Sequence, residues 1–153
     1  MCIRDSGSSY NVIATVTDAA GNATSETTDN ELVIDTTPPA EPTVTTLTTN
    51  DTTPVIEGTA TVGTGETLTV EVSGATYTVV PTGTTWSLDL DTATPTSGTL
   101  TALTDGSYNV IATVTDAAGN ATSETTDNEL VIDTCRSPVH YRSSQKLHSH
   151  RHP

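Results

Sequence analysis

Apolar and polar side chains alternate along much of the chain between residues 42 and 134. In ETLTVEVSG, residues 66–74, Leu and Val take every second position, while Thr and Glu take the positions between them. Successive side chains of a β-strand point to opposite faces, so this period-two pattern predicts a strand with one buried face. No stretch with the 3.6-residue period of a helix competes with it.

Seven runs of this kind lie in the region, and turn-forming residues separate them. They predict strands at residues 42–49, 54–61, 66–74, 75–81, 85–90, 107–115 and 128–134. The side chains expected to face inward are Ile56, Gly58, Ala60, Leu68, Val70, Val72, Trp86, Leu88, Leu90, Tyr108, Val110, Ala112 and Val114. Ser73 and Gly74 predict a tight turn that joins the third and fourth strands into a hairpin. Seven short strands in about 100 residues are typical of a β-sandwich, so the predicted fold class is all-β.

A tyrosine near the start of the sixth predicted strand adds a more specific clue. Tyr108 closely follows an Asp-Gly turn at Asp105 and Gly106. This arrangement resembles the tyrosine corner of immunoglobulin-like sandwiches, in which the tyrosine hydroxyl binds backbone a few residues upstream. We therefore predict an immunoglobulin-like β-sandwich of about seven strands, with structural roles for Tyr108 and for Trp86.

One segment of 28 residues, SYNVIATVTDAAGNATSETTDNELVIDT, occurs twice without a single difference. The copies are Ser9–Thr36 and Ser107–Thr134, and they begin 98 positions apart. That spacing is the size of one sandwich domain and is longer than a solenoid repeat. The sequence therefore predicts a tandem array, with the C-terminal part of one repeat in residues 7–36 and a complete repeat in residues 37–134.

The two ends of the chain differ from the repeats in composition. The first six residues, MCIRDS, match the translation of a transposase adapter used to build sequencing libraries, so residues 1–6 are expected to be an artefact. After Thr134 the chain turns to CRSPVHYRSSQKLHSHRHP, whereas the first copy continues from Thr36 into Thr-Pro-Pro. Threonine codons read in shifted frames encode Pro, Arg, His and Tyr, and so residues 135–153 are expected to be frameshifted or chimeric sequence.

This tail contains residues that could otherwise suggest chemistry. His148, His150 and His152 form a tract of the kind that binds metal, but a disordered tail is the favoured interpretation. Cys2 and Cys135 are the two cysteines of the chain, and a disulfide between them is not favoured.

The repeats themselves are strongly acidic. Residues 7–134 contain no Lys, Arg, His, Cys or Met, and they hold all but one of the 19 acidic residues. Such a surface repels nucleic acid and anionic lipid and attracts cations. We therefore do not expect nucleic acid as a partner. No stretch is long and apolar enough to span a bilayer, so we do not expect this segment to insert into a membrane either.

The same composition bears on catalysis. A nucleophilic triad needs a base such as His or Lys, and the repeats contain neither. Intramolecular Lys–Asn isopeptide bonds are excluded for the same reason. A pair of carboxylates could still serve a glycosidase, but the acids fall on outward strand positions and loop tips. The sequence therefore predicts that this chain is not an enzyme.

Three stretches carry a family resemblance: DTTPPAEPTV, TPVIEGTA and VTDAAGNATSE. They resemble the bacterial Ig-like repeats of giant surface adhesins and biofilm-associated proteins, and the resemblance covers nearly all of residues 7–134. It implies an extracellular location at the bacterial cell surface and neighbouring repeats of the same chain as partners. In the family such modules stack into a stalk that projects a distal binding domain for cell adhesion or biofilm formation, and many members use type I secretion.

Two other functions stay open on the sequence. One is an Ig-like binding module that recognises a glycan or a protein, and the other is an accessory domain of a secreted polysaccharide-active enzyme. A binding module calls for an exposed aromatic platform or a polar cleft. Tyr77 is the one aromatic residue without an assigned role, and a cross-strand packing role explains it equally well.

The resemblance also implies structural Ca²⁺, because related adhesin repeats bind calcium between domains. Calcium prefers six to eight hard oxygen ligands, chiefly carboxylates and carbonyls. In an Ig-like sandwich the loops gather at two poles. At the pole that receives the linker, the expected ligands are Asp35, Glu66, Asp116 and Asn120. At the opposite pole, the residues expected to converge are Asn50, Asp51, Asp105 and Asp133.

A structural interpretation of the same residues is open as well. Asp-Gly, Asn-Asp and DAAGN are ordinary turn sequences, in which the side chain binds its own backbone. The linker TTPPAEP is expected to be stiff in either case, because Pro38, Pro39 and Pro42 restrict the backbone and favour an extended path.

Overall fold

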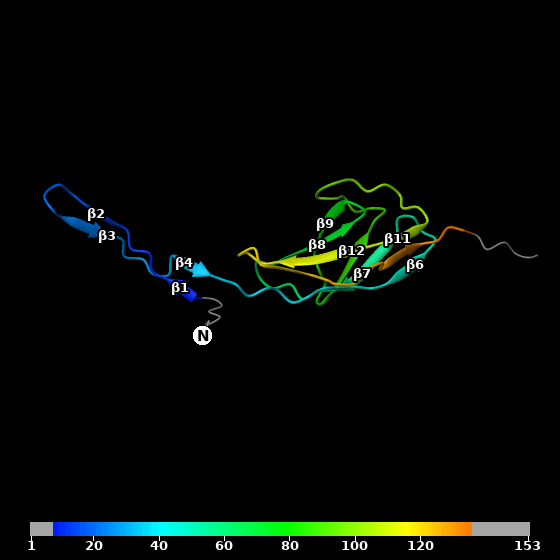
Figure 1. The fold of residues 1–153 in the computed structure, drawn as a ribbon, viewed down its shortest axis with the longest axis horizontal. Helices are drawn as coiled ribbons and strands as arrows, with labels where there is room; N and C mark the ends of the chain where they lie inside the picture. Colours follow the sequence, from blue (N-terminus) through cyan, green and yellow to red (C-terminus); the bar gives the residue numbers. More distant parts are fainter. Residues whose placement is uncertain (1–7, 136–153) are drawn as a thin grey trace, which may run out of the picture.

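The computed structural model describes residues 8–135, and every regular element in that part is a β-strand (Figure 1). The predicted all-β class is confirmed. The predictions for residues 1–6, for Cys2 and for the histidine tract concern residues outside the described part of the chain. The strands are β1 (Ser8–Tyr10), β2 (Thr15–Thr17), β3 (Ala23–Ser25), β4 (Leu32–Ile34), β5 (Thr43–Val44), β6 (Leu47–Thr49), β7 (Val55–Thr59), β8 (Thr67–Val72), β9 (Ala75–Val79), β10 (Thr85–Asp89), β11 (Gly106–Tyr108), β12 (Val110–Thr115), β13 (Ala121–Ser123) and β14 (Leu130–Ile132).

Strands β5–β14 form an immunoglobulin-like sandwich. One layer is the sheet β10-β7-β5, and the other is the sheet β13-β12-β8-β9. A third small sheet, β11-β14-β6, extends the second layer, because β11 leads into β12 and β14 follows β13 along the chain. All pairings in these sheets are antiparallel except the parallel pairing of β6 with β14.

The period-two pattern predicted the inward faces correctly. The residues expected to face inward on β7, β8, β10 and β12 are all buried, and Val70, Val110, Ala112 and Val114 have no exposed surface. Tyr77 is 2% exposed and lies opposite Val70 on the neighbouring strand, so its role is in the core. Burial also raises the pKa of the Tyr77 hydroxyl.

Two local predictions are confirmed in detail. Ser73 and Gly74 connect β8 to β9 with φ of 50° and 80°, the two positive values that a two-residue hairpin turn of this kind requires. The hydroxyl of Tyr108 donates to the Thr104 carbonyl at 2.9 Å and accepts from the Thr104 amide at 3.1 Å. Tyr108 therefore forms a tyrosine corner, although its ring is only half-buried.

Two predicted strands are each divided in the structure, which corrects the prediction. Residues 42–49 form β5, which pairs with β7 in one layer, and β6, which pairs with β14 in the other. Residues 107–115 form β11 and β12, with a break at Asn109. Alternation continues through the break at Asn109, where Tyr108 and Val110 both face the core. Between β5 and β6 it slips by one residue, because Val44 and Leu47, which both pack against the core, are three positions apart.

Strand β13 was missed by the sequence interpretation, which treated this region as a turn. Its three residues Ala-Thr-Ser are too few and too polar to give a period-two signal. The strand exists because it pairs with β12, for instance Val114 with Thr122.

Polar side chains fasten the break at Asn109. The Asn109 side chain donates to Asp127 Oδ1 at 2.8 Å and accepts from the Asn128 amide at 2.9 Å. The amide of Val110 donates to Glu129 Oε2 at 3.0 Å. These bonds, which we call the Asn109 clip, pair the Val110 and Asn128 amides where the strand pairing is interrupted, whereas the buried Glu129 Oε1 has no hydrogen-bond partner.

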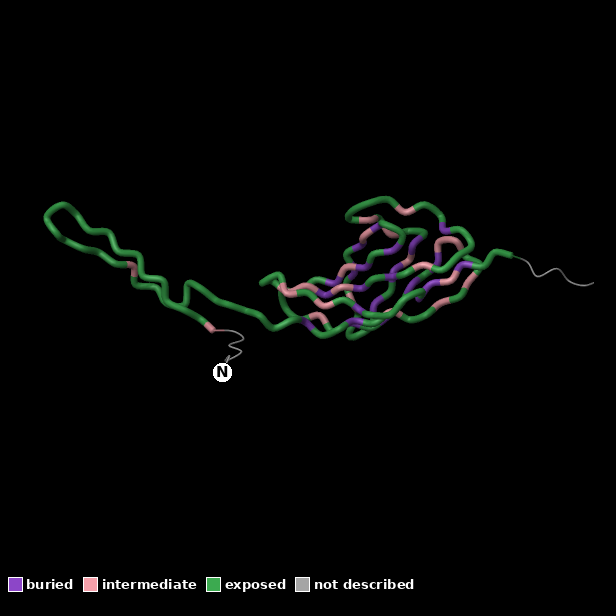
Figure 2. The backbone as a smooth tube through the Cα atoms, in the orientation of Figure 1, coloured by how far each residue is buried: buried purple, intermediate pink, exposed green. Residues whose placement is uncertain are grey.

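The first copy of the repeated segment, β1–β4, lies apart from the sandwich as a thin antiparallel ribbon (Figure 1). We call residues 8–34 the arm. Figure 2 shows almost the entire arm as exposed, whereas buried residues concentrate in the sandwich. The arm nevertheless repeats the hydrogen bonds of the clip, with Asn11 bound to Asp29 and Asn30 and with the Val12 amide bound to Glu31.

Candidate functional site: the linker and the two poles

The linker from Asp35 to Pro42 is bound along the edge of the sandwich. Asn120 Nδ2 donates to the Asp35 carbonyl at 3.0 Å, and Thr122 Oγ1 donates to the Pro39 carbonyl at 2.8 Å. Pro39 and Pro42 are buried. The linker is therefore held by polar contacts along β13 and by burial of its prolines, in addition to the stiffness that proline confers.

Asp116 organises the loop that receives this linker. Its Oδ1 accepts from the amides of Ala118 at 2.9 Å and Asn120 at 2.8 Å, and its Oδ2 accepts from Asn120 Nδ2 at 2.8 Å. Gly119 has φ of 92°, which favours glycine at this position of the turn. The Asn120 side chain, followed by the backbone amides, lowers the pKa of Asp116 below its usual value.

Glu66 lies in the neighbouring loop. Its Oε2 accepts from the Gly63 amide at 2.6 Å. The pairing of Thr67 with Thr115 brings this loop beside the Asp116 loop. Asp35, Glu66, Asp116 and Asn120 thus share one end of the sandwich, as expected, and we call this end the entry pole.

The carboxylates of the entry pole are engaged with backbone in the structure. Asp35 Oδ1 accepts from the Thr37 amide at 3.0 Å, and it is the carbonyl of Asp35 that meets Asn120. Each acidic side chain therefore caps its own turn, as the structural interpretation of these sequences expects.

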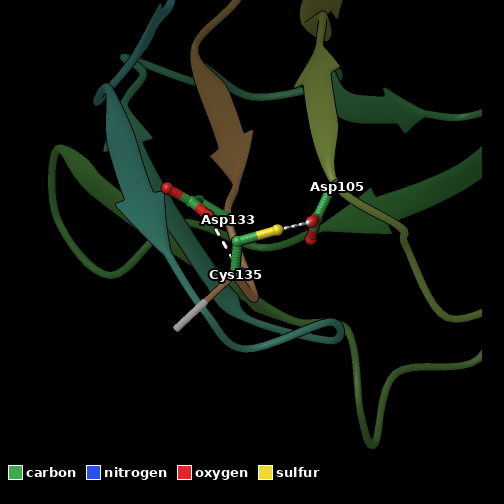
Figure 3. Close-up of side chains that lie close together, drawn as sticks. All are labelled: Asp105, Asp133 and Cys135. Atoms are coloured by element: carbon green, nitrogen blue, oxygen red, sulfur yellow. Dashed lines mark hydrogen bonds between the residues drawn. The ribbon is translucent and has the colours of Figure 1, made fainter. Parts of the chain in front are cut away.

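Asp105 and Asp133 converge at the opposite end, together with Cys135 (Figure 3). One ligand atom from each of the three residues lies within 4.8 Å of the others, and no other group of three metal-ligating side chains in residues 8–135 does so. Asp105 Oδ1 accepts from the Thr134 amide at 2.8 Å, and Cys135 Sγ donates to Asp105 Oδ2 at 3.0 Å. All three side chains are exposed.

These contacts shift the titration of two groups. The Thr134 hydroxyl, the Cys135 thiol and the Thr134 amide lower the pKa of Asp105. The hydrogen bond to Asp105 and the negative charge of that carboxylate raise the pKa of the Cys135 thiol. Cys135 stands where the first copy of the repeat has Thr37.

Asp51 lies near this cluster without joining it. Its amide donates to Thr49 Oγ1, its Oδ1 accepts from the Thr53 amide at 3.0 Å, and the Thr49 carbonyl accepts from the Asp133 amide at 2.9 Å. Asn50 precedes Asp51 in the same turn. We call the end of the sandwich that carries Asn50, Asp51, Asp105 and Asp133 the exit pole.

An open groove of about 530 Å³ lies beside β7 and β10 and bears on a binding role. Its lining is rich in threonine hydroxyls and includes Glu57 and Trp86. Trp86 is only 2% exposed, because its indole packs in the core and its Nε1 donates to the Thr43 carbonyl at 3.2 Å. Neither Trp86 nor Tyr77 supplies an exposed aromatic platform.

Sequence reasoning missed two residues that position the linker. Thr122 and Thr125, on and after β13, bind the Pro39 carbonyl and Glu41 Oε1. It also missed Glu129, which is 1% exposed and is one of two buried acidic residues in the described part of the chain. The sequence Asn-Glu-Leu occurs in both copies of the repeated segment, but no local pattern marks Glu129 as buried.

The fold and these poles define a non-helical sandwich module with a linker bound at its entry pole. The sequence model of the bacterial Ig-like domain matches residues 45–134 of the chain. This match covers more than half of its length, so the chain belongs to the bacterial Ig-like domain family. Such a domain is typically a non-catalytic module.

A comparison with curated proteins finds no match to this chain. Residues 8–135 contain no helix with the length and hydrophobicity that crossing a membrane requires.

Proposed function

We propose that this chain is a section of an extracellular stalk, in which tandem Ig-like repeats of a bacterial surface adhesin project a distal binding domain. Membership in the bacterial Ig-like family supports a module of this kind. The repeated segment supports a tandem arrangement, because its two copies are identical over 28 residues. The stalk acts mechanically, so the stiffness of the junction between repeats matters more than any reactive side chain.

The bound linker is the observation that carries this proposal. A flexible linker would leave successive modules free to reorient, and the stalk would collapse toward a random chain. Here three hydrogen bonds, from Asn120, Thr122 and Thr125, tie the linker to the module that follows it. The direction in which the chain enters each repeat is thereby defined.

The two poles belong to a single junction when repeats follow one another. Asp35 occupies in the first copy the position that Asp133 occupies in the second. The exit pole of one repeat, with Asp51, Asp105 and Asp133, would therefore face the entry pole of the next, with Glu66, Asp116 and Asn120. We propose that Ca²⁺ binds in this junction, neutralises its carboxylates and stiffens it further.

The test uses two complete repeats in tandem, each with the sequence of residues 37–134, followed by small-angle X-ray scattering and thermal melting. We expect an extended particle, and Ca²⁺ should raise the melting temperature of the tandem relative to chelator but not that of one repeat alone. Replacing Thr122 by Val in the second repeat should shorten the maximum dimension. The same replacement in the first repeat is the control, because no other repeat is attached to the linker that precedes it.

The two parts of the proposal fail separately. A broad distribution of dimensions that Thr122→Val does not change would contradict a rigid junction. Equal melting temperatures with Ca²⁺ and with chelator would remove calcium from the proposal and leave the stalk role standing.

A further inference from the structure

One peptide group at the end of the repeated segment occurs in two settings. It joins Asp35 to Thr36 in the first copy and Asp133 to Thr134 in the second. The sandwich follows this peptide group in the first copy and precedes it in the second. We call the Asp-Thr pair, in either copy, the joint. The two copies together therefore show how a repeat contacts the joint after it and the joint before it.

In the first copy, the sandwich that follows holds the carbonyl of the joint. Asn120 Nδ2 donates to the Asp35 carbonyl at 3.0 Å. Asn120 is itself fixed by its loop, because its Nδ2 also donates to Asp116 Oδ2 and its amide donates to Asp116 Oδ1, both at 2.8 Å. The donor is preorganised, so binding the joint orders few additional groups.

In the second copy, the sandwich that precedes holds the amide of the joint. Asp105 Oδ1 accepts from the Thr134 amide at 2.8 Å and from the Thr134 hydroxyl at 2.5 Å. One residue earlier, the Asp133 amide donates to the Thr49 carbonyl at 2.9 Å. The residue 98 positions before Asp105 is Gly7, so the first copy carries no carboxylate that could make this contact.

The two sets of contacts use different atoms of the same peptide group. The joint has the same local form in both copies: Asp35 Oδ1 accepts from the Thr37 amide and Asp133 Oδ1 accepts from the Cys135 amide, each at 3.0 Å. No peptide bond in the described residues is cis. The carbonyl and the N–H of a trans peptide point in opposite directions, so one repeat can bind the carbonyl while another binds the N–H.

The joint is also the place where backbone freedom remains between repeats. Strand β14 ends at Ile132, directly before the joint. Directly after the joint, Thr37 precedes a proline and is thereby restricted to extended conformations, and Pro39 and Pro42 are buried. Rotation of one repeat relative to the next is therefore concentrated at the joint.

We infer that two neighbouring repeats hold the joint at once: Asp105 of the repeat before it binds the amide, and Asn120 of the repeat after it binds the carbonyl. This inference rests on the tandem arrangement proposed above. The two contact distances place Asp105 Oδ1 and Asn120 Nδ2 within about 8 Å of each other, on opposite sides of one peptide group. Asp105 is thus the positioning residue of the preceding repeat. The contacts involve protein atoms alone, so they do not depend on Ca²⁺.

The experiment uses two repeats of residues 37–134 in tandem, in the presence of chelator. The core residues of the sandwich lie within residues 44–132, so each repeat contains its whole core. Residues 37–134 contain no cysteine, and Ser87 is exposed on β10. Ser87→Cys in each repeat therefore provides two specific sites for spin labels. Double electron–electron resonance then measures the distribution of distances between the repeats.

We expect a narrow distribution in the parent tandem. Asp105→Ala in the first repeat removes the acceptor and should widen the distribution at least about twofold, toward that of a flexible linker. Asp105→Asn keeps an oxygen that accepts from the Thr134 amide and should leave the distribution narrow. Asn120→Ala in the second repeat should widen it as much as Asp105→Ala does, and combining the two should add nothing, because either loss frees the joint.

The matched controls are Asp105→Ala in the second repeat and Asn120→Ala in the first, which make the same changes outside the junction and should leave the distribution unaltered. If Asp105→Ala in the first repeat leaves the distribution narrow while Asn120→Ala in the second widens it, the inference is overturned and the bound linker of the proposed stalk stands. Equal widening by Asp105→Asn and Asp105→Ala would also overturn it, because the charge of Asp105 would then act in place of its hydrogen bonds. A broad distribution in the parent would instead contradict the rigid junction on which the proposed function depends.

Discussion

At the scale of single residues, the acidic side chains of the poles act first on their own backbone. Asp116 accepts three hydrogen bonds from within its loop, and Asp18 makes the same bonds in the exposed arm. In both copies the side chain of the following Asn is the main cause of a lowered aspartate pKa. The loop TDAAGN thus takes the same form with or without a sandwich beneath it.

The lowered pKa of Asp116 predicts a dependence of stability on pH. A carboxyl group with a lower pKa in the folded state stabilises that state above its unfolded pKa of about 3.9, and this contribution is lost as pH falls through the folded pKa. We expect the free energy of unfolding, measured with urea, to decrease as pH falls below about 4. Asp116→Asn should reduce that slope. Asp18→Asn, the matched change in the arm, is the control and should leave the slope measured by Trp86 fluorescence unaltered.

At the scale of elements, period-two alternation predicted the strands that face the core, and pairing decided where they break. The runs that form β8, β10 and β12 carry Val, Leu, Trp or Ala at every second position, which is sufficient to predict burial. The prediction of one strand over residues 42–49 overlooked the change of partner between β5 and β6, although the apolar residues Val44 and Leu47 are three positions apart at the point where the pairing changes. Alternation did not predict β13 either, because this short strand at the edge of its sheet is mostly polar.

The Asn109 clip provides a test at this scale. Glu129→Ala removes the carboxylate that accepts from the Val110 amide and leaves that donor unpaired inside the sandwich. The loss should lower the free energy of unfolding by about 1–3 kcal/mol, measured by urea titration of Trp86 fluorescence. Glu31→Ala deletes the same bond in the arm and is the matched control. Equal effects of the two variants on the sandwich would refute a specific role for the buried clip.

At the scale of the whole molecule, one sequence in two settings separates local from tertiary stability. The arm keeps its hairpin pairings, its Asp18 turn and its clip. No strands equivalent to β8 or β6 pair with the arm in the structure, so the arm has no second layer. A two-stranded ribbon with an exposed apolar face is marginally stable by itself.

Hydrogen exchange of the native chain should show this difference directly. Residues 15–17 of β2 and residues 113–115 of β12 are identical and have identical neighbours in the sequence, so their amides have equal intrinsic exchange rates. We expect the β12 amides to exchange at least about 100-fold more slowly than those of β2, because only β12 requires opening of the sandwich. The measurement is mass spectrometry of peptides at low protein concentration. Comparable protection in the two strands would contradict a difference in stability between the two copies.

The sequence by itself determined the all-β class, the inward faces of the core strands, the turn at Ser73 and Gly74 and the tyrosine corner. These features follow from side-chain period, from backbone preferences and from hydrogen bonds that span a few residues. The tertiary structure alone decided that β6 pairs in parallel with β14, that Glu129 is buried and that Thr122 holds the linker. Such contacts join segments distant in the chain, and the same 28 residues buried in one copy and exposed in the other show that no local pattern specifies them.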